Sequence, residues 1–471
     1  MTHRVVKEAA TLGLAAAALL LARSDAATSP GWRTQVVSSI QQVRSDLIVP
    51  PDVCLKFDDG GGYDVSEGAT VTVRGPLEAP LARIFYGSGR VILEHGSVDR
   101  VHPEWWGARP DDGAEDTAAI QAAIDSLYPK PPPGKEPQGG GTVFLSPGRY
   151  DIASRLVFRS GITLEGVLNQ SCVYATMPLA AMLQRPDLTP PPDGIHYNAA
   201  TRVDGVQIRN LTFDGGSRDS EVGLDLTNTN YAVVENVSVI HCKTGILLGQ
   251  LGMYNTFMNV AVGICDVGME WNIGTMNNNM FGCRFGAVRT GMLINHTGQL
   301  NLYGTTFDSY KEVGVDVRGG DSVNLNNLWF DSVAPTTAIR IGPRVSQCTI
   351  LNPRFSGPTP KELDIQAPDT VILDTVATHS VGLSLTRALA GGLRGTVSLS
   401  GADAVAPVRF TAPEADNSYF VAVTVTSAKG NPPVGARVVT VAEKSVDGFV
   451  IALQEPPGPD AVVVVEWIVV R

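Results

Sequence analysis

Four acidic residues have the type and spacing needed for acid–base chemistry. Asp308, in the phrase TTFDSY, and Asp331, in LWFDSV, are 23 residues apart, whereas Glu270 and Asp316, in GMEW and GVDV, are 46 residues apart. Hydrolysis of a glycosidic bond commonly uses two carboxylates, about 5 to 5.5 Å apart in retaining enzymes and about 6.5 to 9.5 Å apart in inverting ones. The alternative is a structural role, because a carboxylate at a strand end can accept backbone N–H bonds in a turn.

Aromatic side chains flank these carboxylates in the sequence. They are Trp271, Tyr303, Tyr310 and Trp329. An aromatic ring combines an apolar face with, in Tyr and Trp, a polar tip, so an exposed one suits the stacking of a sugar ring. The alternative for each of the four is ordinary packing in the protein interior.

A repeat of about 23 residues explains the spacing of the carboxylates. The phrase NLTF ends at Phe213, and its equivalents end at Val239, Val262, Phe285, Phe307, Phe330 and Phe355. A second phrase, GLDL, begins at Gly223 and recurs at Gly245, Gly268, Gly291 and Gly314. Short alternating runs between glycines leave room for about three strands per repeat. The sequence therefore predicts an all-β fold, a parallel β-helix in which each repeat forms one rung and equivalent strands pair about 4.8 Å apart.

This register predicts how the carboxylates lie. Asp308 and Asp331 stack one rung apart, near 5 Å, and their proximity is expected to raise the pKa of one of them. Glu270 and Asp316 lie two rungs apart, roughly 9.6 Å along the axis. The same outward row is predicted to contain Asp225, Asp364, Leu247 and Leu293. Leucines are an unusual choice for a solvated face, so we expect a long loop or a partner chain to cover this surface.

An asparagine precedes the NLTF-like phrase in most repeats. In VQIRNLTF the apolar alternation shifts by one residue at Asn210, which predicts a bend. Asparagine tolerates the left-handed backbone conformation that such a bend requires. We therefore predict an internal ladder of stacked side chains formed by Asn210, Asn236, Asn259, Asn327 and Asn352.

The cysteines and histidines indicate neither a disulfide scaffold nor a metal site. Cys242 and Cys265 occupy the same position in neighbouring repeats, where they form either a disulfide or a buried stack of thiols. The chain has six Cys and seven His, but no CxxC, HxxxH or HExxH motif. We expect no metal and no other cofactor.

The segments outside the repeats predict further parts. Residues 31–100 contain short strand-like runs with glycine turns, and residues 101–380 contain a helix followed by the β-helix. Asp116 is the predicted N-cap of this helix, whose apolar face is Ile120, Ala123, Ile124 and Leu127. We expect the helix to plug the open N-terminal end of the solenoid. Residues 401–471 lose the repeat and predict a separate small β-domain, resembling a β-sandwich.

Charge and the first residues limit where the protein acts. The formal net charge is −11, which disfavours nucleic acid and anionic membrane surfaces as partners. Residues 1–26 have a short basic start, an apolar run and a small-residue site, Ser24-Asp25-Ala26, typical of a cleaved signal peptide. The alternative is an uncleaved membrane anchor, although the run is shorter than a spanning helix needs. We expect a secreted protein, extracellular or periplasmic.

Several phrases resemble one known superfamily. PEWWGA, DDGAEDTAAIQAAI, GGGTVFLSPGRYDI and SGITLEGV are similar to segments of the pectate-lyase-like superfamily, specifically its bacterial and phage members related to glycoside hydrolase family 28. The resemblance covers roughly residues 50 to 380. It implies a right-handed parallel β-helix, a polysaccharide-directed role and often a trimer, as in phage tailspikes.

The family's catalytic motifs are not carried over. The polygalacturonases carry Gly-His-Gly and Arg-x-Lys motifs, both absent here, and Asp-Asp occurs only at 58–59 and 111–112, before the repeats. Two classes of function remain: a polysaccharide depolymerase, with hydrolysis preferred over elimination, and a non-catalytic glycan-binding, adhesive or spike-type structural protein. A homotrimer is expected, with Leu247 and Leu293 at the interface between chains.

Overall fold

The computed structural model describes most of the chain outside its N-terminal segment. The described residues are 32–129, 139–186, 202–217, 219–332, 336–356, 361–367, 370–373, 376–377, 394–410 and 419–470. The predicted signal peptide, residues 1–26, lies outside these ranges. Within them, no helix has both the length and the apolar character needed to cross a membrane.

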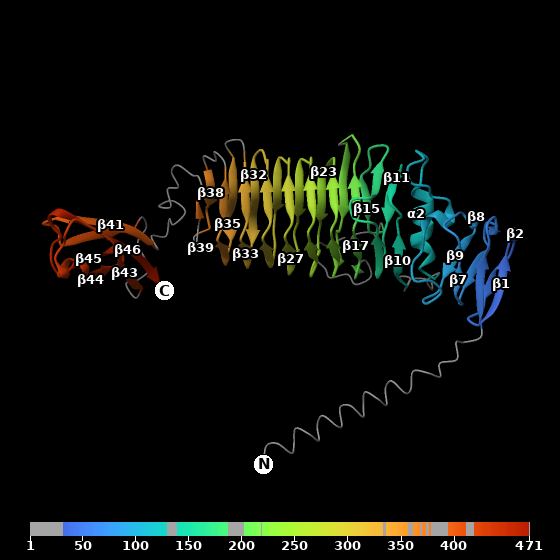
Figure 1. The fold of residues 1–471 in the computed structure, drawn as a ribbon, viewed down its shortest axis with the longest axis horizontal. Helices are drawn as coiled ribbons and strands as arrows, with labels where there is room; N and C mark the ends of the chain where they lie inside the picture. The colour runs from blue at the N-terminus through green and yellow to red at the C-terminus, as the bar shows by residue number, and fades with distance from the viewer. Residues whose placement is uncertain are drawn as a thin grey trace, which may run out of the picture. The chain divides into compact units, whose positions relative to one another are not determined.

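Three parallel sheets form the main coil, with successive rungs side by side (Figure 1). The first sheet contains, in spatial order, β10 (Gly141–Phe144), β13 (Ile162–Glu165), β17 (Gln207–Arg209), β21 (Val233–Glu235), β24 (Thr256–Met258), β27 (Asn278–Phe281), β30 (Leu300–Tyr303), β33 (Val323–Asn326), β36 (Cys348–Leu351) and β39 (Val371–Leu373). The second contains β11 (Gly148–Ile152), β14 (Ser171–Ala175), β18 (Thr212–Asp214), β22 (Ser238–Ile240), β25 (Ala261–Gly263), β28 (Arg284–Gly286), β31 (Thr306–Asp308), β34 (Trp329–Asp331), β37 (Arg354–Ser356) and β40 (Val376–Ala377). The third contains β12 (Leu156–Val157), β15 (Ala181–Gln184), β19 (Ser220–Asp225), β23 (Cys242–Leu248), β26 (Val267–Trp271), β29 (Thr290–Ile294), β32 (Val313–Gly320), β35 (Thr337–Val345) and β38 (Lys361–Ile365). A small sheet pairs β16 (Val203–Asp204) with β20 (Thr229–Asn230). The predicted parallel β-helix is confirmed.

Identical side chains stack inside the coil because strands pair in register. The rings of Phe285, Phe307 and Phe330 follow one another with centroids 5.2 and 5.0 Å apart and nearly parallel planes. The repeated glycine has a steric cause. A Cβ at Gly268 would lie 2.5 Å from the carbonyl oxygen of Gly291 and 2.6 Å from the Phe285 ring, so this position excludes a side chain.

The predicted asparagine ladder forms, but at the surface edge of the coil. The Nδ2 of Asn236 donates to Oδ1 of Asn210 at 3.0 Å, and the Nδ2 of Asn259 donates to Oδ1 of Asn236 at 2.8 Å. All five predicted residues have positive φ angles, between 49° and 56°. Asn259 is exposed, so the expectation that this ladder is internal is wrong.

A buried asparagine ladder occupies different positions. Asn230, Asn255 and Asn278 are fully buried. The Oδ1 of Asn255 accepts the N–H of Ala232 at 2.8 Å, and the Oδ1 of Asn278 accepts the N–H of Asn255 at 2.9 Å. These amides satisfy backbone groups at a turn that would otherwise be buried without partners.

The N-terminal region forms a separate short coil of three turns. Its three parallel sheets are β1 (Arg33–Val37), β4 (Val53–Phe57) and β7 (Leu77–Glu78); β2 (Ile40–Val43), β5 (Gly62–Val65) and β8 (Phe85–Gly87); and β3 (Leu47–Val49), β6 (Thr70–Val73) and β9 (Arg90–Leu93). The 3-10 helix η1 (Pro103–Trp106) and the helix α2 (Thr117–Ser126) follow. By contacts, this region forms one compact unit with β10, β11 and β13, and the remaining described chain forms a second.

The structure does not confirm the predicted role of the helix as an N-terminal plug, because three turns of coil precede it in the chain. The apolar face is confirmed, since Ile120, Ala123 and Ile124 are fully buried. Asp116 occupies the N-cap position but makes no capping hydrogen bond. Its carboxylate instead accepts the N–H groups of Arg109, at 3.0 Å, and Asp151, at 3.2 Å.

The C-terminal strands are antiparallel. One sheet has the order β41 (Arg394–Gly401), β46 (Gly458–Val470) and β43 (Phe420–Lys429), and the other β42 (Val405–Arg409), β45 (Gly448–Leu453) and β44 (Val439–Ser445). The 3-10 helix η2 (Val434–Arg437) lies between β43 and β44 in the chain. Both sheets contribute to one apolar core that includes Leu399, Phe449, Ile451 and Val463.

Candidate functional site

One row of side chains runs across seven consecutive strands of the third sheet. Parallel pairing gives its members the same register position, between inward-facing neighbours such as Ile246 and Leu248: Asp225, Leu247, Glu270, Leu293, Asp316, Arg340 and Asp364. The predicted common register of these acids and leucines is therefore confirmed. Both leucines are half-buried, so neighbouring side chains already cover much of their surface.

Ion pairs sequester the carboxylate of Asp316. Its Oδ2 lies 3.3 Å from Nε of Arg318 and 3.4 Å from Nη1 of Arg340. The Nε of Arg340 lies 3.3 Å from Oδ2 of Asp364. The Asp316 side chain is only 4% exposed. A carboxylate held between two guanidinium groups and screened from solvent is a poor candidate for contact with substrate. Its ion-pair contacts are with these two arginines.

A chain of amide hydrogen bonds continues the polar surface beside this row. The Nδ2 of Asn295 donates to Oδ1 of Asn272 at 2.8 Å and lies 3.3 Å from Oε1 of Glu270. The Oδ1 of Asn295 accepts from Nη1 of Arg318 at 3.2 Å. Glu270 and Asn272 belong to one rung, Asn295 to the next and Arg318 to the one after, so the network links neighbouring rungs along the coil axis.

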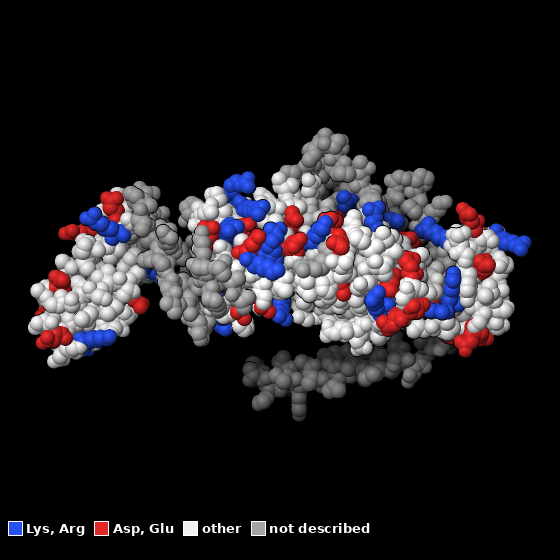
Figure 2. Space-filling view, turned by 90° about the horizontal axis from the view of Figure 1, so that it is seen from above, with Lys and Arg blue, Asp and Glu red and all other residues white. Residues whose placement is uncertain are grey.

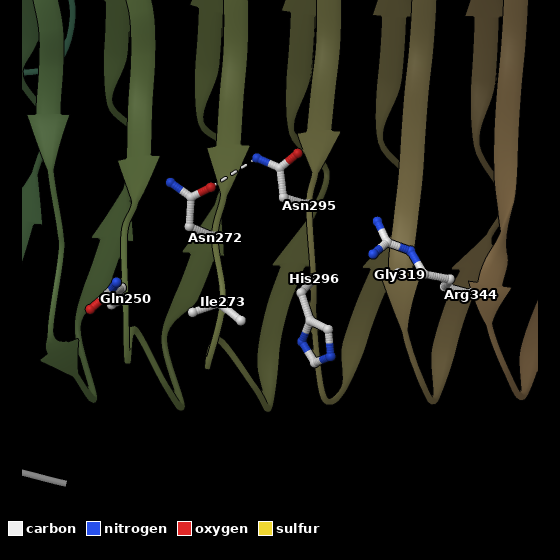
Figure 3. Close-up of a pocket in the computed structure, with 7 residues that line it drawn as sticks. All are labelled: Gln250, Asn272, Ile273, Asn295, His296, Gly319 and Arg344. Atoms are coloured by element: carbon white, nitrogen blue, oxygen red, sulfur yellow. Dashed lines mark hydrogen bonds between the residues drawn. The ribbon is translucent and has the colours of Figure 1, made fainter. Parts of the chain in front are cut away.

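These amides line a cavity of about 610 Å³ at the C-terminal ends of the third-sheet strands and the turns that follow them (Figure 3). Its lining residues come from successive rungs: Gln250, Asn272, Ile273, Asn295, His296, Gly319 and Arg344. Figure 3 shows Asn272 and Asn295 facing each other, with Ile273 and His296 in the turns that follow them. Arg344 forms no ion pair with any described residue. We call this cavity the third-sheet groove.

The third-sheet groove combines the groups that recognise a polyhydroxylated ligand. Amides both donate and accept hydrogen bonds, the imidazole does so in its neutral form, and the guanidinium only donates. Ile273 is 44% exposed and adds an apolar contact.

Among the described residues there is no group of three or more His, Cys, Asp or Glu side chains arranged to hold a metal ion. Acidic and basic side chains are interspersed over the face seen in Figure 2.

The other predicted carboxylate pair lies on a different sheet. Asp308, on β31, and Asp331, on β34, are register partners in the second sheet, as predicted. The Nη2 of Arg284 donates to Oδ2 of Asp308 at 2.6 Å, and the Ser309 hydroxyl donates to Oδ1 at 2.8 Å. The Arg284 bond, followed by the Ser309 bond, lowers the pKa of Asp308. The expected rise is therefore wrong for Asp308, which is ionised near neutral pH.

The four predicted aromatic residues divide into two groups. Trp271 is fully buried and Tyr310 is 1% exposed, so the prediction that they stack on sugars is wrong. Both side chains pack in the interior. Tyr303 stacks on Phe281 in the first sheet, with ring centroids 5.3 Å apart. Trp329 is 50% exposed on the second sheet, where its Nε1 donates to Oγ of Ser356 at 3.0 Å.

Sequence reasoning based on carboxylates did not identify the amide and cationic residues of the groove. A signal was present for two of the amides, because Asn272 and Asn295 are 23 residues apart, and Arg318, which bonds to Asn295, follows after another 23 residues. His296 lies in the turn after β29, where the repeat fixes positions less strictly, whereas Arg344 lies in β35 opposite Gly319 of β32. The buried thiol prediction is supported, since no pair among the six cysteines, all within the described residues, forms a disulfide and both Cys242 and Cys265 are buried.

The coil belongs to a recognised class of fold. Residues 105–178 match the family model described as rhamnogalacturonase A/epimerase, pectate lyase-like. This match and the three coiled parallel sheets confirm the resemblance inferred from the sequence: the chain contains a pectate-lyase-like parallel β-helix. Comparison with curated proteins gave no significant match.

Several solved structures are similar to the chain. ORF18 of Geobacillus virus E2 has 14% identity and a TM-score of 0.48, with 76% of each chain covered. A mutant tailspike protein of E. coli bacteriophage HK620, in complex with a pentasaccharide, has 10% identity and a TM-score of 0.43, covering 79% of this chain and 93% of the other. The A-module of the Azotobacter vinelandii mannuronan C-5 epimerase AlgE4 has 14% identity and a TM-score of 0.33, covering 59% and 95%.

Proposed function

We propose that the protein binds a polysaccharide in the third-sheet groove, with the sugar chain running along the coil axis. The observation that carries this proposal is the placement of hydrogen-bonding side chains on successive rungs, all opening into one cavity. A repeating ligand can contact equivalent groups at each rung. The match of residues 105–178 to a family model described by polysaccharide-active enzymes supports this class of ligand.

The geometry of the groove favours binding over hydrolysis. Glu270 contacts Asn295, which lines the groove, but the carboxylate two rungs away, Asp316, is buried in ion pairs. Hydrolysis by two carboxylates requires that both reach the scissile bond. A binding or adhesive role needs neither an acid nor a nucleophile, so the groove fits it without further groups.

A depolymerase is the second candidate, and it rests on the second sheet. Asp308 and Asp331 are adjacent in register, which gives a separation of about 4.8 Å between their backbones, near the range for a retaining mechanism. Trp329 is exposed two residues before Asp331 and offers a ring to a sugar. In this mechanism the ionised Asp308 is the nucleophile, and Asp331 is the acid.

Binding can be tested by affinity electrophoresis against a panel of bacterial and plant polysaccharides. Ile273→Glu with His296→Glu adds bulk and negative charge to the groove and should abolish the retardation of the wild-type protein by its ligand. The control, Tyr303→Ala, changes an exposed ring on the first sheet and should leave retardation unchanged. Retardation that survives the groove variant and disappears in the control would place the site on the first sheet.

Catalysis is separable from binding by reducing-sugar release from the same panel. Asp308→Asn with Asp331→Asn should abolish any release while leaving retardation intact. Release that persists in this variant and disappears in Glu270→Gln would move the chemistry to the third sheet. A protein that binds a polysaccharide and releases no reducing ends would exclude the depolymerase.

We also propose export and a homotrimer. Export rests on the composition of residues 1–26, and mass spectrometry of secreted protein should show a chain that begins near Ala27. The trimer rests on the apolar side chains of Leu247 and Leu293, which occupy the outward row of the third sheet. Leu247→Asp with Leu293→Asp should reduce the mass measured by light scattering from that of a trimer to that of a monomer. An unchanged mass would reject this interface.

A further inference from the structure

A second cavity, of about 520 Å³, lies within the N-terminal compact unit. Its walls are the turn between β8 and β9, the side of α2, and the segments around Trp106 and Arg159. The lining residues include Ser88, Arg90, Trp106, Ala122, Asp125 and Arg159. None of them belongs to the third-sheet groove, so the cavity is a separate site.

Two arginines at this cavity are held in place by protein groups. The Nη2 of Arg90 donates to the carbonyl oxygen of Tyr128 at 2.6 Å, and no described carboxylate pairs with this guanidinium. The Nε of Arg159 lies 3.6 Å from Oδ1 of Asp125, which also accepts from Nε2 of Gln121 at 3.2 Å. Anchoring one edge of each guanidinium lowers the entropic cost when the other edge binds a ligand.

An indole contributes an apolar surface beside these charges. Trp106 is half-buried and packs against Phe85, with ring centroids 5.0 Å apart, which fixes its orientation. Asp125 remains 43% exposed and can accept a hydrogen bond from a hydroxyl. The cavity therefore offers an aromatic ring, an acceptor and cationic donors within one space.

The turn that forms one wall is built so that the backbone approaches closely. Gly87 has φ +80°, and a Cβ there would lie 2.2 Å from the carbonyl oxygen of Val65. A Cβ at Gly89 would lie 2.4 Å from the carbonyl oxygen of Ser66. Only glycine fits at these two positions, which leaves the exposed Ser88 between them at the cavity wall.

We propose that this cavity binds an acidic sugar residue, with its pyranose ring against Trp106 and its carboxylate on Arg90 and Arg159. The local charge selects a monoanion. Asp125 offsets the charge of Arg159, so the excess positive charge is that of Arg90 alone. A hydroxyl of the ring donates to Asp125. The aromatic surface distinguishes this site from a binding site for a small inorganic anion, because such an anion has no ring to stack on an indole.

The test measures binding of glucuronic acid, glucose and inorganic phosphate to the full chain by isothermal titration calorimetry and saturation-transfer NMR at millimolar ligand. Glucuronic acid should bind at least about tenfold more tightly than glucose, because the neutral sugar forms no charge-assisted bond with the arginines. Arg159→Gln should weaken glucuronic acid about fivefold or more, by losing one such bond. Phosphate should bind more weakly than glucuronic acid.

Matched substitutions on α2 locate the site. Ala122 lines the cavity, so Ala122→Phe should block glucuronic acid, whereas the exposed Ala118, on the same helix, can be changed to Phe without loss of binding. Thermal unfolding of both variants checks that each one folds. The groove variant Ile273→Glu with His296→Glu should bind glucuronic acid as the wild type does, which keeps this result independent of the polysaccharide groove.

Three outcomes would overturn the proposal. One is no binding of glucuronic acid by the wild-type protein. Another is equal binding by Ala122→Phe, which would place the ligand elsewhere. The third is phosphate binding as tight as that of glucuronic acid and unaffected by Trp106→Leu, which would make the cavity a simple anion site.

Discussion

Asn295 and Asn272, each the first residue after a third-sheet strand, form a hydrogen bond between neighbouring rungs, with Nδ2 of Asn295 2.8 Å from Oδ1 of Asn272. The same nitrogen lies 3.3 Å from Oε1 of Glu270, and Oδ1 of Asn295 accepts a hydrogen bond from Nη1 of Arg318. Asn295 therefore joins an amide and a carboxylate from the preceding rung to a guanidinium from the following rung, at the wall of the groove (Figure 3).

The coupling between these two amides can be measured by a double-mutant cycle. Asn295→Ala should lower the free energy of unfolding by about 1 to 2 kcal/mol, because it removes one hydrogen bond to Asn272 and one to Arg318. The cycle with Asn272→Ala should give a coupling of about 0.5 to 1.5 kcal/mol by urea denaturation. Strictly additive effects would show that the bond contributes nothing.

The surface asparagine ladder should contribute to stability through both its bonds and its backbone conformation. Asn259 has φ 51° and donates to Asn236 at 2.8 Å. Asn259→Leu should destabilise by about 1 to 3 kcal/mol, from the lost bond and the left-handed backbone. Asn259→Gly is the matched control, since it loses the bond without the backbone penalty and should be milder. An unchanged melting temperature in the Leu variant would contradict the ladder's role.

The repeated glycine of the third sheet should be required by its surroundings. Gly268→Ala places a methyl group 2.5 Å from a backbone oxygen and 2.6 Å from a phenylalanine ring, so we expect a loss of about 3 kcal/mol or more in the free energy of unfolding. Gly282 has φ +60° but no described atom within 4 Å of an added Cβ. Gly282→Ala should therefore lose only about 1 to 2 kcal/mol, the cost of the left-handed conformation. Equal losses would show that the close contact relaxes.

Stability should depend on the protonation of Asp116. Burial raises the pKa of this carboxyl from 3.8 to about 6, despite the two backbone N–H groups that it accepts. The folded state holds the proton more tightly than the unfolded state does. The contribution of the protonated carboxyl to the free energy of unfolding is therefore complete below about pH 4 and is lost as the pH rises through 6, a change of about 3 kcal/mol. Asp116→Asn cannot ionise, so its unfolding free energy should lack this fall. Parallel pH profiles for the two proteins would contradict the shift.

The sequence alone determined the main coil and much of its register. A period of 23 residues requires that equivalent side chains stack, so the phenylalanine stack, the surface asparagines and the common row of Glu270 and Asp316 followed from spacing. It did not reveal the N-terminal coil, whose strands lack that repeated phrase, or the buried ladder of Asn230, Asn255 and Asn278.

Tertiary structure decided which of the aligned residues are accessible. Spacing fixes a residue's rung but not the direction of its side chain at a strand end, so Trp271 and Tyr310 proved buried while Trp329 is exposed. Spacing also does not show which cation reaches a carboxylate. Arg318 and Arg340 close over Asp316, and Arg284 holds Asp308 ionised. Burial and ion pairing depend on all the side chains that surround a position, and only the folded chain brings those together.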